Sequence, residues 1–299
     1  MKCLFKGSAV ALVTPMKNNN VDFDAFEKLL KIQMEAKTDA VVVLGTTGEP
    51  STLSREEKND IISFAKGVLD GKCKLIVGTG GNNTRAVIHD SLIAKTLGAD
   101  GLLVVTPYYN KATDKGLLLH YDTIARCVDL PIILYNVPSR TGVNLKPELV
   151  MRLAKTKNIV GIKEASGNIN QIVKLFHLVG NDIAIYSGED QLNYLFLTMG
   201  ASGVISAAAN VAPKHIKKIC DLALNGQFSH ALKLQNKMYD LNNSLFLEVN
   251  PIPVKTALNM QGVINEEFRL PLCEMEEKNK RVLKKQVSKF ENLENDLQL

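Results

Sequence analysis

The feature that most constrains the fold of this chain is a regular alternation of short apolar runs with longer segments of helical periodicity. A short apolar run bounded by turn residues is typical of a strand that is buried on both faces of a parallel sheet. Between the runs, apolar residues recur three and four positions apart, as they do on one face of a helix. The eight runs lie at residues 8–14, 40–44, 75–77, 101–105, 132–135, 159–163, 183–186 and 203–206.

Eight strands separated by helices, with one unit in roughly 25–30 residues, are the pattern of a (β/α)8 TIM barrel. A doubly wound sheet is the alternative, but such sheets seldom reach eight regular units. After the eighth run the sequence keeps only helical periodicity, for example at Leu234, Met238 and Leu241. We therefore predict an α/β chain in which residues 1–224 form a barrel catalytic domain and residues 225–299 form a C-terminal helical appendage.

Composition and charge argue against several classes of function. The formal net charge of +5 comes from lysines spread along the chain, and Trp is absent, so no nucleic-acid partner is expected. No apolar run approaches the roughly 20 residues that cross a bilayer, so no membrane partner is expected either. The five cysteines are widely spaced, with no Cys-x-x-Cys pair. This spacing argues against disulfides and a zinc site and favours a cytoplasmic location.

One lysine stands at the end of a predicted strand. Lys163 closes the sixth apolar run, and in barrel enzymes the chemistry gathers at the carboxyl ends of the strands. Burial at this position removes the hydration of an ammonium group and favours a neutral amine, which is what a Schiff-base nucleophile requires. The alternative is a lysine that extends to solvent or pairs with Glu164, and for an isolated lysine that structural role is the commoner one.

The other predicted strand ends carry residues that suit the same chemistry. Hydroxyls and phenols can move protons, and an arginine and turn amides can hold carboxylates, although each can also serve only in a turn, a core or a solvated surface. No strand end offers a histidine, and no carboxylates have metal-ligand spacing. The set therefore predicts a class I aldolase-type site with a covalent imine on Lys163 and with neither metal nor cofactor. Its members are Thr46, Thr47, Tyr108, Tyr109, Tyr135, Arg140, Gly188 and Glu189.

Four motifs give the chain its resemblance to a known family. They are Gly45-Thr-Thr-Gly-Glu49, Tyr108-Tyr-Asn110, Tyr135-Asn-Val-Pro-Ser-Arg-Thr-Gly142 and Gly161-Ile-Lys-Glu-Ala-Ser166. Together they resemble the dihydrodipicolinate synthases, barrel enzymes of the N-acetylneuraminate lyase superfamily. The resemblance extends over nearly the whole chain. It implies condensation of pyruvate with L-aspartate 4-semialdehyde, on the diaminopimelate route to lysine.

The resemblance implies catalytic roles for four residues. Lys163 would form the imine with pyruvate, and Tyr135 would be the proton donor and acceptor. Thr46 and Tyr109 would complete a proton relay, with Tyr109 supplied by the neighbouring subunit across a dimer interface. The family is usually a homotetramer of two tight dimers, and the same assembly is expected here.

The residues that would bind substrate also separate this family from its relatives. By the resemblance, Thr47 holds the pyruvate carboxylate, and the backbone of Gly188 and Ile205 lines the pocket. Arg140 would clamp the carboxylate of the semialdehyde, a group that arginine is well suited to bind. Sialic-acid and sugar-acid lyases typically lack an arginine there. N-acetylneuraminate or 2-keto-3-deoxygluconate aldolase activity is therefore the enzymatic alternative, and a non-catalytic barrel is the remaining one.

One departure from the family concerns feedback control. Lysine-inhibited members carry a histidine and a glutamate in an effector cleft where this chain has Lys58 and Ala86. Tyr108 and Asn82 of that cleft are retained. Because a lysine at position 58 repels a cationic effector, the sequence predicts weak or absent inhibition by lysine.

Overall fold

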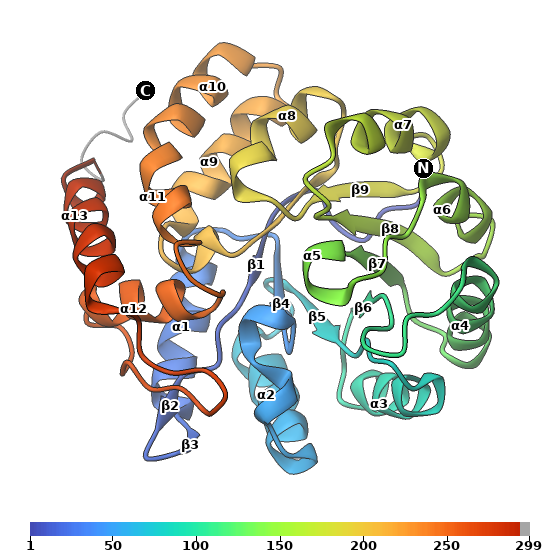
Figure 1. Cartoon of the computed structure of the whole chain (residues 1–299), viewed down its shortest axis with the longest axis horizontal. Coiled ribbons are helices and arrows are strands. Elements are labelled where there is room, and N and C mark those ends of the chain that lie inside the picture. The colour runs from blue at the N-terminus through green and yellow to red at the C-terminus, as the bar shows by residue number, and fades with distance from the viewer. Residues whose placement is uncertain (294–299) are drawn as a thin grey trace.

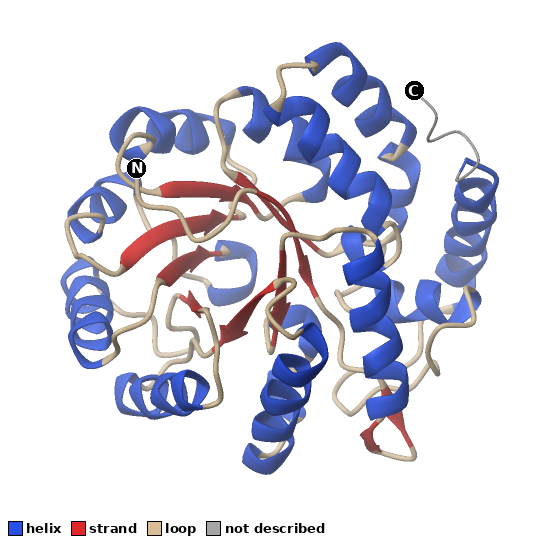
Figure 2. Cartoon of the chain, turned by 180° about the vertical axis from the view of Figure 1, so that it is seen from behind, coloured by secondary structure: helices blue, strands red, loops and turns tan. Residues whose placement is uncertain are grey.

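The predicted strands form one closed parallel barrel. They are β1 (Gly7–Ala11), β4 (Ala40–Val43), β5 (Lys74–Gly78), β6 (Gly101–Val105), β7 (Ile132–Asn136), β8 (Ile159–Glu164), β9 (Ala184–Ser187) and β10 (Gly203–Ser206). In the computed structural model, which describes residues 1–293 and side chains through residue 290, their cyclic order is β1-β10-β9-β8-β7-β6-β5-β4. Helices surround the strands on the outside (Figure 1 and Figure 2). The (β/α)8 barrel predicted from the sequence is confirmed.

A close contact between two glycines closes the barrel. Gly7 of β1 pairs with Gly203 of β10, and a Cβ atom on Gly203 would lie 2.0 Å from the carbonyl oxygen of Gly7. Gly7 has a φ of +109°, a conformation that other residues rarely adopt. The last strand pair therefore depends on glycine at both positions.

Within residues 1–293, eight helices form the outer layer of the barrel. They are α1 (Phe23–Glu35), α2 (Arg55–Leu69), α3 (Thr84–Thr96), α4 (Asp114–Cys127), α6 (Pro147–Leu153), α7 (Ile169–Val179), α8 (Asn193–Thr198) and α9 (Pro213–Leu224). Helix α2 begins at a capping box, in which Ser54 Oγ accepts the Glu57 N–H and the Glu57 carboxylate accepts the Ser54 N–H. These bonds satisfy amides that have no partner in the first helical turn.

Side chains fill the interior of the barrel and block one of its ends. Residues along each strand alternate between the interior and the helical layer, and the interior cluster includes Ala9, Val42 and Leu103. The ring of Phe5 stacks on that of Tyr186, with centroids 4.4 Å apart. Because Phe5 precedes β1, this stack plugs the end at which the strands begin. The opposite end, where the strands finish, is left for the site.

Some local features differ from the sequence prediction. A two-stranded hairpin of β2 (Met16–Lys17) and β3 (Asn20–Val21) and a short helix, α5 (Pro138–Thr141), were not anticipated. The first apolar run predicts a strand to residue 14, but β1 ends at Ala11. The chain leaves the sheet there, and the N–H of Val13 donates to the side-chain oxygen of Asn210 at 3.0 Å.

The chain after the barrel is helical, as predicted. It contains α10 (Phe228–Lys237), α11 (Tyr239–Ser244), α12 (Ile252–Met260) and α13 (Glu277–Leu293), and α13 packs against α11 and α12 (Figure 1). The domain boundary at residue 224 stays a prediction, and residues 294–299 of the predicted appendage lie outside the described residues. Among the helices described here, none is long and apolar enough to cross a membrane.

Candidate active site

Lys163 lies beside Tyr135 inside the barrel. The two residues are direct partners on the adjacent parallel strands β8 and β7, and the Lys163 Nζ atom is 4.4 Å from the centroid of the Tyr135 ring. Both side chains are buried, and Lys163 is only 6% exposed. The face of a tyrosine ring attracts a cation at this distance. The fold therefore places a buried amine against a phenol at the carboxyl ends of two strands.

The carboxylate next to Lys163 in sequence faces away from it. Successive residues of a strand point to opposite sides, and the Glu164 carboxylate accepts hydrogen bonds from Asn136 Nδ2 at 3.0 Å and from the Ser166 N–H at 2.8 Å. Burial raises the pKa of Glu164, although these hydrogen bonds oppose the shift. An ion pair with Glu164, the structural alternative for Lys163, does not match this geometry.

Gly188, directly after β9, makes room for the lysine side chain. A Cβ atom at Gly188 would lie 2.9 Å from Lys163 Cε and 2.8 Å from Ala165 Cβ, which is closer than packed carbon atoms approach. Ile205 of β10 is buried in the interior cluster that also contains Tyr135. The structure thus brings Gly188 against Lys163 and places Ile205 in the same part of the barrel interior.

The strand β4 ends in a tight turn that carries both threonines. This turn consists of two short 3-10 helices, η1 (Thr46–Gly48) and η2 (Pro50–Thr52). Thr47 is buried, and its Oγ1 accepts a hydrogen bond from Asn250 Nδ2 at 2.9 Å. The carbonyl oxygen of Gly48 accepts a hydrogen bond from the Thr14 hydroxyl at 2.8 Å. These bonds fix the position of the turn.

Asn250 connects two of the predicted binding residues, and the sequence analysis did not identify it as part of the site. In addition to its bond with Thr47, its backbone oxygen accepts a hydrogen bond from Arg140 Nη2 at 3.1 Å. The sequence prediction placed residue 250 in the helical appendage. The available signal was Asn250-Pro-Ile-Pro253, because two closely spaced prolines mark an irregular segment rather than a helix interior.

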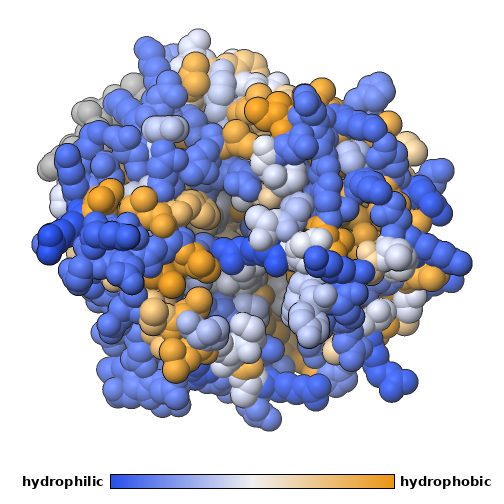
Figure 3. All heavy atoms as spheres, viewed as in Figure 1, coloured by the Kyte–Doolittle hydropathy of each residue, from blue (hydrophilic) through white to orange (hydrophobic). Residues whose placement is uncertain are grey.

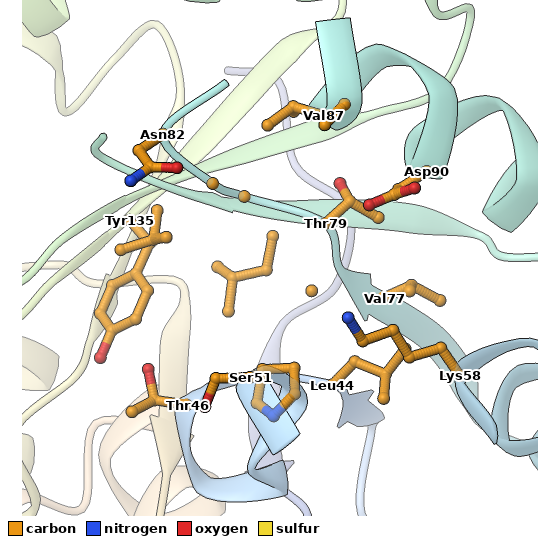
Figure 4. A pocket seen from close by; sticks show the side chains of 18 of the residues that line it. Leu44, Thr46, Ser51, Lys58, Val77, Thr79, Asn82, Val87, Asp90 and Tyr135 are labelled. Carbon is orange, nitrogen blue, oxygen red and sulfur yellow. The ribbon is translucent and has the colours of Figure 1, made fainter. Parts of the chain in front are cut away.

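A cavity of about 580 Å³ opens beside these residues. Thr46, Tyr135 and Arg140 line it, and it extends outward between α2 and α3. In Figure 4 the hydroxyl of Tyr135 points toward the side chain of Thr46. Hydrophilic side chains cover most of the molecular face shown in Figure 3, with apolar groups scattered among them. A volume of a few hundred cubic ångströms is typical of a small-molecule site.

Tyr109 does not join this group within one chain. It is 91% exposed and has a φ of +69°, which is unusual for a bulky residue. The preceding residue, Tyr108, lines the cavity instead. The predicted relay of Thr46, Tyr109 and Tyr135 is therefore incomplete in a single copy of the chain.

Among the residues that the structure describes, neither histidines nor clustered metal ligands line this site. Within the described part of the chain, no group of three or more His, Cys, Asp or Glu side chains could hold a metal ion. His120 and His215 lie on the outer helices α4 and α9, where burial lowers the pKa of each to about 4. The arrangement instead offers an amine, hydroxyls and an arginine, which suits covalent and proton-transfer chemistry.

Comparison with known proteins decides the family. The model of the Dihydrodipicolinate synthetase family matches residues 4–290. The chain belongs to this family. A 4-hydroxy-tetrahydrodipicolinate synthase from Clostridium novyi (strain NT) is 48% identical over 287 residues, which are 96% of this chain and 97% of the relative. One from Alkaliphilus oremlandii (strain OhILAs) is 48% identical over 286 residues, 96% of this chain and 99% of the relative.

Solved structures of the dihydrodipicolinate synthetase family have the same fold. The enzyme from Aquifex aeolicus superposes with a TM-score of 0.94 at 44% identity and covers 96% of this chain and 98% of its own. The enzyme from Thermotoga maritima gives a TM-score of 0.94 at 42% identity, with the same coverage of 96% and 98%. These matches confirm the predicted activity, which is that of a lyase in the diaminopimelate route to lysine.

Glu189 adds a titratable carboxyl group to this family member's site. Burial raises its pKa to about 7, the neighbouring Asp190 adds to the shift, and Lys163 and Arg140 oppose it. Since the pKa of Glu189 in the folded state is above that of an ordinary glutamate, this residue stabilises the fold at acidic pH. That stability is lost as pH rises through about 7.

The Glu189→Gln variant is therefore expected to gain stability relative to the wild type as pH rises from 5 to 8. The gain should be about 2 kcal/mol after allowance for solvent screening, because the glutamine has no proton to lose. Urea denaturation of both proteins at several pH values across this window measures it. A difference in unfolding free energy that stays constant with pH would contradict the prediction.

Proposed function

We propose that this chain condenses pyruvate with L-aspartate 4-semialdehyde through a covalent imine on Lys163. The observation that carries the proposal is the buried Lys163 amine, 4.4 Å from the centroid of the Tyr135 ring, at the catalytic end of the barrel. A solved relative from Acinetobacter baumannii, 44% identical, is described as complexed with pyruvate. The imine itself is the electron sink, so the proposal requires neither metal nor cofactor.

The reaction begins when the Lys163 amine adds to the keto carbon of pyruvate. Loss of water from the carbinolamine gives the imine, and its cationic nitrogen makes the methyl carbon acidic. Removal of a proton from that carbon gives an enamine, which attacks the aldehyde carbon of the second substrate while the aldehyde oxygen takes up a proton. The amino group of the second substrate then attacks the imine carbon, closes the ring and releases Lys163 as a free amine.

Each of these steps moves a proton, and we assign its transfer to Tyr135. In the proposal Tyr135 protonates the departing hydroxyl of the carbinolamine and later the aldehyde oxygen. Thr46, toward which the phenol points (Figure 4), passes the proton on, and Tyr109 of a neighbouring copy completes the relay. A chain of hydroxyls transfers protons without admitting bulk water.

The two carboxylates of the substrates bind at different places. The pyruvate carboxylate binds to the hydroxyl of Thr47 and to amides of its turn, since clustered backbone amides attract anions. The backbone of Gly188 and Ile205 lines the wall next to the imine. The carboxylate of the semialdehyde binds to Arg140, whose guanidinium can form two parallel hydrogen bonds with it.

Replacing Arg140 by alanine is expected to lower kcat/KM for the semialdehyde by about 10- to 100-fold, because a charge-assisted hydrogen bond contributes roughly 1.5–3 kcal/mol. The amount of pyruvate adduct trapped by borohydride should change by less than about two-fold, since that step precedes binding of the semialdehyde. Steady-state kinetics with both substrates varied gives the first quantity. Arg126→Ala, at an exposed position of α4, is the matched control.

The same assay distinguishes the alternative aldolases. A wild-type protein that condensed pyruvate with N-acetylmannosamine, or cleaved 2-keto-3-deoxygluconate, faster than it used the semialdehyde would contradict the proposal. So would an Arg140→Ala variant whose kcat/KM for the semialdehyde equals that of the wild type.

Lysine is expected to inhibit this protein weakly or not at all. Lys58 and Ala86 line the outer part of the cavity together with Tyr108 and Asn82, and Figure 4 shows the Lys58 amine directed into it. Two ammonium groups in one cavity repel each other. A solved relative from Cyanidioschyzon merolae, 36% identical, is described with lysine bound.

A lysine titration of the initial rate tests this expectation. The double variant Lys58→His/Ala86→Glu removes the repelling charge and adds an opposite one, so it should become more sensitive to lysine than the wild type. Half-maximal inhibition of the wild type at micromolar lysine would contradict the prediction.

We infer that the active assembly is a homotetramer of two tight dimers. Tyr109 is 91% exposed in one chain. This exposure supports the proposal that its side chain contributes to the active site of a neighbouring subunit. A solved relative, 42% identical, is called the first monomeric dihydrodipicolinate synthase variant. Sedimentation velocity combined with activity at decreasing protein concentration tests the inference. Full activity of a dissociated monomer would contradict the shared tyrosine.

We also propose a cytoplasmic location. All five cysteines are free, three of them exposed or partly exposed, which suits a reducing compartment. Fractionation of the source cells, with measurement of activity in each fraction, tests this proposal.

A further inference from the structure

A buried ion pair joins the turn after β4 to the C-terminal helix α12. Lys255 Nζ lies 2.7 Å from Glu49 Oε1, and the two side chains are 0% and 1% exposed. Lys255 also lies over the ring of Phe268, 4.9 Å from its centroid. Glu49 stands between η1 and η2 with a φ of +53°. The pair therefore holds the backbone at the point where the turn changes direction.

A buried ion pair of this kind adds little net free energy to the stability of a fold. Burial lowers the pKa of Lys255 even though Glu49 opposes the shift, and Glu49 Oε2 has no hydrogen-bond partner among the described residues. Removing two charges from water costs about as much as their attraction returns, so apolar residues of similar size often serve equally well. The arrangement is better explained by the position that it imposes than by stability.

The position that it imposes is that of the predicted pyruvate turn. Glu49 is two residues after Thr47, and Lys255 is five residues after Asn250, which donates to the Thr47 hydroxyl. Arg269 makes a third connection to the turn: its Nη1 atom donates a hydrogen bond to the Thr52 carbonyl oxygen at 2.9 Å. The C-terminal segment thus contacts the turn at three points along its length.

We propose that the Glu49–Lys255 ion pair is a positioning device that sets the turn for the pyruvate carboxylate. This inference rests on the proposed function, in which Thr47 and its turn bind that carboxylate. Lys255 acts through Glu49 and touches no substrate, so it is a positioning residue. The C-terminal helices are then part of the active site's support rather than an appendage to it.

The test replaces both charges by apolar groups of similar size, in the double variant Glu49→Leu/Lys255→Met. Its melting temperature should stay within about 3 °C of the wild type. Its KM for pyruvate should nevertheless rise by about five-fold or more, because small displacements of a binding group are costly. Its KM for the semialdehyde should change by less than about two-fold, since Arg140 is held by the Asn250 carbonyl oxygen and not by Glu49 or Lys255.

A second variant keeps the test valid if the double variant does not fold. Glu49→Gln preserves the shape and one acceptor, and it should raise the KM for pyruvate by about two-fold or more. Lys280→Met is the matched control, because it removes a partly buried C-terminal ion pair with Glu266 that is separate from the turn. It should leave both KM values unchanged.

An unchanged KM for pyruvate in a folded double variant, or in Glu49→Gln if the double variant is unfolded, would overturn the inference. So would an equal rise for both substrates, because that pattern indicates a general loss of structure. Failure of the proposed function gives a different result, in which the wild-type protein itself forms no pyruvate adduct that borohydride can trap.

Discussion

The Lys163→Ala variant is expected to lose condensation activity by about 10⁴-fold or more, because removal of a covalent nucleophile eliminates the reaction path rather than slowing one step. Incubation with pyruvate and borohydride should add one reduced pyruvate to the wild-type chain and none to the variant. Intact-mass measurement followed by peptide mapping locates the adduct. On the wild type, it should fall on the peptide that contains Lys163.

Two further variants exclude trivial explanations of that loss. Lys163→Met keeps the volume of the buried side chain, and it should be as inactive as alanine while unfolding at nearly the wild-type temperature. Lys157→Ala removes an exposed lysine six residues earlier and should retain full activity and adduct formation. An adduct on Lys163→Ala, or activity within about ten-fold of the wild type, would show that another amine carries the imine.

The barrel could be predicted because its strands are buried on both faces. Such strands appear in a sequence as continuous apolar runs, and β6 and β10 begin and end at the bounds of their runs, Gly101–Val105 and Gly203–Ser206. Helix α12 could not be recognised in this way. Seven consecutive residues, Ile252 to Leu258, are buried, and Lys255 and Thr256 are among them, so the polar residues of this helix do not mark a solvent-exposed face as they do on a surface helix.

The site could be predicted only in part, for reasons of distance along the chain. For Lys163 taken alone the structural role is the commoner one, and its significance came from the fold that places Tyr135 on the next strand. Asn250 and Lys255 reach the turn after β4 from 203 and 206 positions away. No local pattern encodes such contacts. They follow from the packing of the C-terminal helices against the barrel. For this reason the sequence prediction included no residue of those helices in the site.

The Tyr135→Phe variant is expected to lower kcat by about 10²- to 10³-fold, which is a typical contribution of a positioned general acid and base. Phenylalanine keeps the ring beside the Lys163 amine, so the imine should still form and be trapped by borohydride, but more slowly. Stopped-flow measurement of adduct formation, together with steady-state turnover, separates these two effects. Tyr121→Phe is the matched control. It removes the hydroxyl of another buried tyrosine, one that donates to the Val104 carbonyl oxygen at 3.2 Å on the outer side of the barrel, and should leave kcat within about two-fold.

A combined variant then tests whether Tyr135 and Thr46 form one relay. Residues that act as a unit show strongly non-additive losses, because the first substitution already breaks the path. Thr46→Val should therefore reduce kcat on the wild-type background but add less than about three-fold to the loss in Tyr135→Phe. If the two losses multiply instead, the residues act on separate steps, and Tyr135 would exchange its proton with solvent or substrate directly. A Tyr135→Phe variant with unchanged kcat would remove the phenol from the mechanism altogether.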